Sequence, residues 1–200
     1  MDTREKILQA AREIFVEKGK DGARMQEIAD RAGVNKALLH YYFTSKEKLY
    51  LEIIYDAFSE LFRYLSERFN EPHSIEEFVE ILVENHVNFV AKNRDLLKLL
   101  GFAVLREEEA IYKPLIKSIK NEFKIPKTVF SIFTKAMLQG KIRKINPVQT
   151  VISIISMNIF YFFISPLLKQ IAPIPIKNEE KFIEERKKAI VDLVLRGILK

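Results

Sequence analysis

Residues 24–49, with the sequence RMQEIADRAGVNKALLHYYFTSKEKL, decide how the rest of this chain is interpreted. Apolar residues recur there at helical spacing, at Met25, Ile28, Ala29 and Ala32. Gly33 favours the left-handed conformation that ends a helix, and Asn35 is a good N-cap for a second short helix over 36–42. Two short helices joined by such a turn form a helix-turn-helix, whose second helix enters the major groove of DNA.

The same stretch resembles the DNA-binding domain of the tetracycline-repressor (TetR) family of transcriptional regulators. The family pattern IAxxAGVxxxxLxxYFxSKExL is matched by Ile28-Ala29, Ala32-Gly33-Val34, Leu39, Tyr42-Phe43, Ser45-Lys46-Glu47 and Leu49. This resemblance covers about the first quarter of the chain, and the remainder agrees in length and helical pattern. It implies an all-α fold of about nine or ten helices, with a helix-turn-helix DNA-binding domain over 1–48 and a helical ligand-binding and dimerisation domain over 49–200.

The family resemblance also identifies the residues that should contact DNA. Groove-facing roles fall on Lys36, Ala37 and His40, and phosphate contacts on Tyr41, Tyr42 and Lys46. Lysine donates to guanine or phosphate, and an alanine side chain meets the thymine methyl group. For His40, capping or packing is the alternative, while Leu39 and Phe43 should pack inward. Where the family usually has Ser or Thr before this motif, the chain has Ala23-Arg24, so we expect Arg24 to supply the phosphate contact there.

Helices are predicted on both sides of this motif. A capping box, Asp2-x-x-Glu5, starts a first helix that ends near Lys18. A second capping box, Thr44-x-x-Glu47, opens a longer helix that Pro72 stops. That helix has about 24 residues and is therefore roughly 36 Å long. In the family the corresponding helix connects the DNA-binding and regulatory domains.

Aromatic residues after position 70 provide candidates for an effector pocket. Ser74-x-x-Glu77 caps a helix whose apolar stripe includes His86, and further helices follow over 94–106 and up to Gly140. The candidate pocket residues are His86, Phe89, Phe102, Phe130, Phe133, Met137 and Phe160. The alternative is that the same side chains form an ordinary core, in which His86 makes one hydrogen bond. We expect no metal site, because no second histidine or carboxylate lies three or four residues from His86 on that stripe.

A basic segment over 113–144 carries nine basic residues and one acidic residue, Glu122. Its lysines recur at spacings of three to four and include Lys113, Lys117, Lys120, Lys124, Lys127 and Lys135. One interpretation is a solvated basic face on a helix. The other is a site for an anionic ligand, such as an acyl thioester of coenzyme A.

In the family that this chain resembles, the penultimate helix packs against both its own domain and the partner subunit, so the resemblance implies that the last two predicted helices form the interface between two subunits. Asn146-Pro147-x-Gln149 is a strong helix start, and the residues that follow, 148–168, carry no charge. A helix that is apolar all round is normally buried all round. A membrane span is the alternative, but interspersed polar residues lower the hydrophobicity, so no membrane partner is expected. The final helix follows Asn178 over 179–199, and two helices from each subunit would give a two-fold symmetric homodimer.

Composition narrows the remaining possibilities. The net charge is +6 and the pI is about 9.3, yet residues 1–48 carry 10 basic and 8 acidic side chains, so DNA affinity depends on where the charges lie. The chain has no cysteine, and its N-terminus lacks the apolar core of a signal peptide, so we expect a cytoplasmic protein. No catalytic triad spacing, paired-carboxylate site or phosphate-binding loop is found, so we expect neither enzymatic activity nor a cofactor.

Taken together, these patterns and the family resemblance predict a transcriptional regulator, and the resemblance implies a repressor, because repression is the commoner mode of that family. A homodimer would bind a palindromic operator with half-sites about 34–36 Å apart. A small, largely apolar ligand would favour a conformation in which the long helix over 45–68 swings and the two DNA-binding domains no longer match that spacing. The alternatives are a regulator of the same fold without an effector, or one with an anionic acyl-thioester effector. An enzyme with an appended helix-turn-helix would instead need a polar constellation in residues 70–200, which the sequence lacks.

Overall fold

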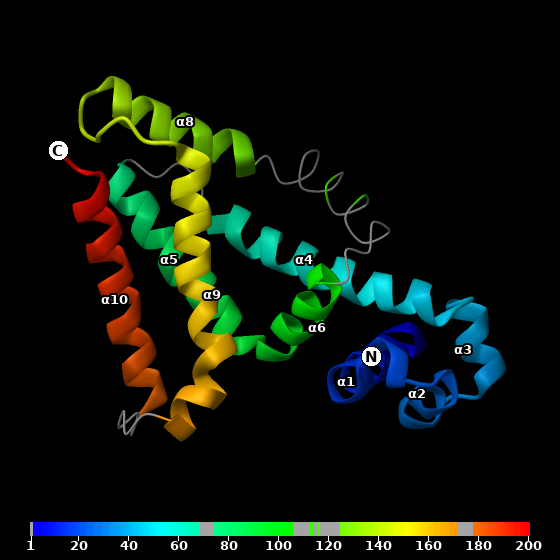
Figure 1. The fold of residues 1–200 in the computed structure, drawn as a ribbon. Helices are drawn as coiled ribbons and strands as arrows, with labels where there is room; N and C mark the ends of the chain where they lie inside the picture. The colour runs from blue at the N-terminus through cyan, green and yellow to red at the C-terminus, as the bar shows by residue number, and fades with distance from the viewer. Residues whose placement is uncertain (1, 69–73, 106–112, 114–115, 117–124, 172–177) are drawn as a thin grey trace. The chain divides into compact units, whose positions relative to one another are not determined.

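The structure is a computed structural model that describes residues 2–68, 74–105, 113, 116, 125–171 and 178–200. These residues form helices and no strand, apart from one isolated bridge between Ile142 and Leu199, so the predicted all-α fold is confirmed. The helices, shown in Figure 1, are α1 (Thr3–Gly22), α2 (Met25–Ala32), α3 (Lys36–Tyr42), α4 (Lys46–Arg68), α5 (Ile75–Lys92), α6 (Arg94–Leu105), α8 (Ile125–Leu138), α9 (Pro147–Ile171) and α10 (Glu179–Ile198).

The chain divides into two compact units. The first comprises residues 1–60 and 94–119, and the second comprises 61–93 and 120–200. The first unit therefore holds α1, α2, α3 and α6, and the boundary falls within α4. The contacts thus divide the chain after residue 60, whereas the predicted boundary between the DNA-binding and the ligand-binding domain lies after residue 48. That functional boundary remains a prediction.

In the first unit, local signals start α1 and α3 and end α2 as the sequence predicts. The Asp2 side chain accepts from the Glu5 N–H at 2.8 Å, and the Glu5 carboxylate accepts from the Asp2 N–H at 2.8 Å, which completes the capping box. Gly19 has φ +69° and interrupts α1, which then continues for one more turn to Gly22. Gly33 has φ +68° and ends α2, and the Asn35 side chain caps α3 through the Leu38 N–H at 2.7 Å.

The start of α4 is a correction to the sequence analysis. The Ser45 hydroxyl, not that of Thr44, accepts from the backbone at the helix start, from the Lys48 N–H at 3.2 Å. Its backbone carbonyl also accepts the first intrahelical bond, from the Leu49 N–H at 3.1 Å. Because both Thr44 and Ser45 are good N-caps and only one can precede the first turn, the predicted N-cap was placed one residue early, and the residue three positions after Ser45 is Lys48 rather than Glu47.

Helix α6 belongs to the core of the first unit through contacts with α1 and α4. The Arg12 guanidinium pairs with the Asp95 carboxylate at 2.8 Å, and the Tyr50 hydroxyl donates to the Leu99 carbonyl at 3.3 Å. Phe15 packs edge-on against Tyr50, with ring centroids 5.1 Å apart. Burial raises the pKa of Asp95, but the hydrogen bond and charge of Arg12 outweigh it and hold that pKa below its usual value.

In the second unit, α5 is the central helix and contacts α8, α9 and α10 (Figure 1). The predicted cap is confirmed, because the Ser74 hydroxyl accepts from the Glu77 N–H at 3.0 Å. The predicted stripe is also buried, at Ile75, Phe78, Val79, Leu82, His86, Phe89 and Val90. A buried lysine was not predicted: Lys187 of α10 donates to the Asn88 side chain of α5 at 3.1 Å and pairs with Glu184 at 2.5 Å.

The sequence predicts that α9 is buried on all sides. Within the single chain, however, it is buried on one face only. Its buried face contains Ile154, Asn158, Tyr161, Phe162 and Ser165. Its other face exposes six large apolar side chains, those of Val148, Ile152, Phe160, Phe163, Leu167 and Ile171. On α10, Ile183, Ile190 and Val194 are buried whereas Ala189, Leu193 and Gly197 are exposed, so the apolar residues of both helices cover two faces.

Candidate nucleic-acid interface and effector region

The exposed face of α3 is the candidate DNA-reading surface. Lys36, Ala37, His40 and Tyr41 are all exposed, and their spacing places them on one side of the helix. Tyr41 is 80% exposed although it is a large aromatic residue, whereas Leu39 on the opposite side is 0% exposed. An exposed face of mixed basic, small and aromatic character on a rigidly packed helix suits the major groove.

The other face of α3 is held by the core of the reading head, the name used here for α1, α2 and α3. Leu39 and Phe43 are buried as predicted, and the Arg4 guanidinium lies 5.8 Å from the centre of the Phe43 ring. The turn is closed by backbone bonds from the Gly33 N–H to the Asp30 carbonyl at 3.2 Å and from the Val34 N–H to the Ala29 carbonyl at 3.0 Å. The groove-facing side chains therefore project from a fixed base.

Charge in the reading head is distributed unevenly. Arg31 of α2 makes two bonds to Glu17 of α1, at 2.6 and 3.1 Å, and Lys18 pairs with Glu27 at 2.9 Å. The hydrogen bond from Arg31 lowers the pKa of Glu17, and that from Lys18 lowers the pKa of Glu27. These cations are compensated within the head, whereas Lys36 makes no ion pair with any residue that the structure describes. Its charge is therefore available to an anionic partner.

The predicted phosphate contacts have three different environments. Arg24 is exposed at the N-cap of α2 and makes no side-chain cap. Tyr41 and Tyr42 are exposed and lie edge-to-face, with ring centroids 5.5 Å apart. Lys46 is different, because its ammonium donates to the carbonyls of Asp21 at 3.3 Å and Ala23 at 3.1 Å.

The predicted effector residues whose side chains the structure describes have different environments. Among those it describes in the second unit, His86, Phe89 and Phe133 are buried, and Met137 is half-buried. The expectation that Phe130 and Phe160 face the interior is wrong for the single chain, because they are 45% and 61% exposed. The α8 and α9 stripes were assigned from apolar spacing, which does not distinguish an interior from an intersubunit face. The Phe102 side chain lies outside the described residues.

A polar pair lies inside the otherwise apolar contact between α5 and α9. The Asn158 side-chain nitrogen lies 3.4 Å from His86 Nδ1, and both residues are buried. Burial lowers the pKa of His86 to about 4, so its imidazole is neutral at pH 7. The Asn158 Oδ1 atom is buried and has no hydrogen-bond partner among the described residues. Sequence reasoning missed Asn158, although an asparagine between large apolar residues in the middle of an uncharged stretch was a usable signal.

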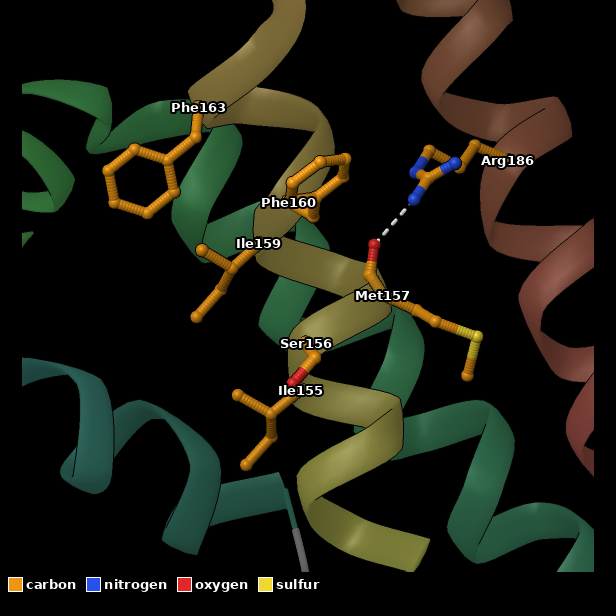
Figure 2. Close-up of a pocket in the computed structure, with 7 residues that line it drawn as sticks. All are labelled: Ile155, Ser156, Met157, Ile159, Phe160, Phe163 and Arg186. Carbon is orange, nitrogen blue, oxygen red and sulfur yellow. Dashed lines mark hydrogen bonds between the residues drawn. The ribbon is translucent and has the colours of Figure 1, made fainter.

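An open groove lies on the exposed side of α9, beside α10. Its volume is about 530 Å³, and its lining includes Ile155, Phe160, Phe163 and Arg186. Figure 2 shows the Arg186 guanidinium turned towards α9, where Nη2 donates to the Met157 carbonyl at 2.6 Å. Burial lowers the pKa of Arg186, and its Nε atom is buried without a partner among the described residues.

Comparisons with known proteins agree with this geometry. A family model described as bacterial regulatory proteins, tetR family, matches residues 7–53. The transcriptional activator FasR of Mycolicibacterium smegmatis is 49% identical over 53 residues, which are 26% of this chain and 24% of FasR. The transcriptional regulator RutR of Escherichia coli is 25% identical over 196 residues, which cover 96% of this chain and 88% of RutR.

A solved structure extends the likeness over the whole fold. The transcriptional regulator FadR from Bacillus subtilis, in complex with stearoyl-CoA, has a TM-score of 0.73 at 15% identity, and the match covers 97% of this chain and 98% of that one. The fold and the exposed face of α3 define a helix-turn-helix, DNA-binding transcriptional regulator. Residues 7–53 carry the match to the tetR family of bacterial regulatory proteins, and the whole chain has the fold of solved TetR-family regulators.

Proposed function

We propose that this chain is a cytoplasmic, homodimeric repressor that binds a palindromic operator and releases it when a small, largely apolar ligand binds its C-terminal domain. The observation that carries the DNA-binding part is the exposed face of α3, from which Lys36, Ala37 and His40 would meet base edges. Arg24, Tyr41 and Tyr42 flank this face and hold the phosphates. Repression is chosen because it is the commoner mode of the family. We expect no catalytic activity.

The homodimer is supported by the exposed apolar face of α9. Soluble monomers rarely leave several neighbouring large apolar side chains in water, and a second copy of the same face would cover them. Pro147–Leu168 is also long and apolar enough to cross a membrane, with a mean hydropathy of 2.0. Its other face, however, packs against α5 through the buried Asn158. We therefore assign the exposed face to a subunit interface.

The effector is proposed to bind near the polar pair between α5 and α9. A mostly apolar site with a few polar groups that fix ligand orientation is typical of small-molecule pockets. The unpaired Asn158 oxygen and the neutral His86 would supply those polar groups, with Phe89 and Phe133 nearby on the buried faces of α5 and α8. The alternative effector is an acyl thioester of coenzyme A, because FadR, which has the same fold, binds stearoyl-CoA.

Ligand release of DNA would follow from a population shift. An operator with two half-sites requires the two reading heads of a dimer to stand about 34–36 Å apart. A ligand that binds better to a conformation with another spacing shifts the population towards it and lowers operator affinity by its differential affinity. The long α4, which begins directly after the reading head, is the element expected to carry this change.

The experiment uses ligand that copurifies with the protein. Organic extracts of the purified protein are analysed by mass spectrometry, and the recovered molecule, palmitate and stearoyl-CoA are each titrated against a fluorescent operator duplex obtained by in vitro selection. Release by the apolar molecules alone supports the proposal, and release by stearoyl-CoA alone supports the alternative. Operator affinity that stays unchanged at saturating concentrations of a bound ligand would contradict the release mechanism.

A further inference from the structure

Lys46 links the two ends of the helix-turn-helix. It is the first residue of α4, directly after the segment that leaves α3, and its ammonium donates to the carbonyls of Asp21 and Ala23. Ala23 is the C-cap of α1 and directly precedes Arg24, the N-cap of α2. One side chain therefore joins the two ends of residues 23–46, the segment that contains both helices of the DNA-binding motif.

The Lys46 ammonium lies where the helix ends favour a cation. The last carbonyls of α1 have no intrahelical partner, and the C-terminal end of a helix dipole attracts positive charge. The N-terminal end of α4 repels a cation, so a lysine at its first position is more stable with its ammonium on the α1 carbonyls than over its own helix end. Two of the three ammonium N–H groups are used by these bonds.

The entry of the chain into α2 has no side-chain cap to fix it. Arg24 occupies the N-cap position without a cap hydrogen bond, where Ser or Thr would supply one. The Ala23 residue before it is restrained by its burial, at 2% exposure, by its N–H bond to the Gly19 carbonyl at 3.2 Å and by the bond from Lys46, and further along α2 the Lys18–Glu27 pair holds the first turn to α1. Because α2 leads through a tight turn into α3, a change at this entry alters the direction of the groove-facing side chains.

We propose that Lys46 is a positioning residue for DNA binding, which holds the entry of α2 against the start of α4, rather than a phosphate ligand. This rests on the DNA-binding function of the reading head but not on the proposed effector or dimer. The two roles of Lys46 have different signatures. A lysine that neutralises a phosphate contributes about 0.9 to the slope of log Kd against log salt concentration, whereas a positioning lysine contributes nothing to that slope.

The test compares Lys46→Met with two matched variants. Lys48→Met removes the same charge two residues further along α4, from an exposed lysine that has no recorded side-chain partner in the described chain. Lys46→Arg keeps a cation that can donate to both carbonyls. Affinity for a selected palindromic duplex is measured by fluorescence anisotropy from about 50 to about 300 mM salt, the range over which phosphate contacts change affinity strongly. Amide hydrogen exchange is followed at residues 24–28 in the free proteins.

We expect Lys46→Met to raise Kd about tenfold, equivalent to about 1.4 kcal/mol, with an unchanged salt slope and faster exchange at residues 24–28. Lys48→Met should change neither slope nor exchange, and Lys46→Arg should restore most of the affinity. A slope lowered by about 0.9 per subunit, with normal exchange, would show a phosphate ligand and overturn the proposal. A lower melting temperature with unchanged Kd in the folded protein would also overturn it, because the role would then be structural only. If Lys46→Met does not fold, Lys46→Gln, which keeps one donor, is judged by the same criteria.

Discussion

Phe160→Asp is the change that tests the proposed subunit interface most sharply. Phe160 is 61% exposed in the single chain, so more than half of its apolar surface remains to be buried by a partner. Burying a whole Phe side chain contributes about 1.5–3 kcal/mol, so the remaining part amounts to about 1–2 kcal/mol. A two-fold axis doubles this to about 2–4 kcal/mol per dimer, and the buried aspartate adds a desolvation penalty. The dimer should therefore dissociate roughly 30- to 1000-fold more readily, at 1.4 kcal/mol per decade.

The assay is sedimentation equilibrium over a concentration series, with Leu138→Asp as the matched control. Leu138 is 84% exposed at the end of α8 and lies outside the apolar face of α9, so its substitution should leave the dimer intact. The melting temperature of the Phe160→Asp monomer should change little, because the residue is already mostly exposed within the chain. A dimer that dissociates equally in wild type, Phe160→Asp and Leu138→Asp would refute the reasoning.

Two further predictions concern the core and the turn. The pKa of His86 falls from 6.5 to about 4 on folding, so the folded state resists protonation. The free energy of unfolding should therefore be highest above pH 6.5 and fall by about 3 kcal/mol as the pH drops to 4. Chemical denaturation of wild type and His86→Leu at several pH values checks this, and the variant should not show the loss of stability at low pH. An equal loss in both proteins would mean that groups other than His86 cause it. Gly33→Ala should destabilise the reading head by about 1–2 kcal/mol, because φ is +68° although no atom lies within 4 Å of an added Cβ. Gly33→Asn should destabilise the reading head less than Gly33→Ala. If thermal melting shows the same loss of stability for both variants, the left-handed conformation is not the cause.

The reading head was predictable because its local signals are strong and agree with one another. Gly33, Asn35 and the apolar positions around them each specify the observed helix ends and the buried side of α3. The cap of α4 was placed one residue early because Thr44 and Ser45 are equally good caps, and only the tertiary position of the helix distinguishes them.

Long-range contacts were not predictable from the same patterns. The ammonium of Lys46 meets carbonyls 23 and 25 residues away along the chain, and Lys187 is buried against Asn88, which lies 99 residues away. Nothing in their local sequence distinguishes these lysines from solvated ones. On α9, apolar residues on all sides led to the expectation that every face is buried. Composition could not show which face packs within the chain and which face the single chain leaves exposed.

The central claim is that the exposed face of α3 reads a two-fold symmetric DNA sequence. The most direct measurement is in vitro selection of duplexes from a random-sequence pool by the purified wild-type protein, with Lys36→Ala and His40→Ala run in parallel. The account predicts a palindromic consensus with half-site centres about 34–36 Å apart, and altered or weaker base preference in the two variants. Enrichment of no sequence, or the same consensus and affinity in all three proteins, would contradict it.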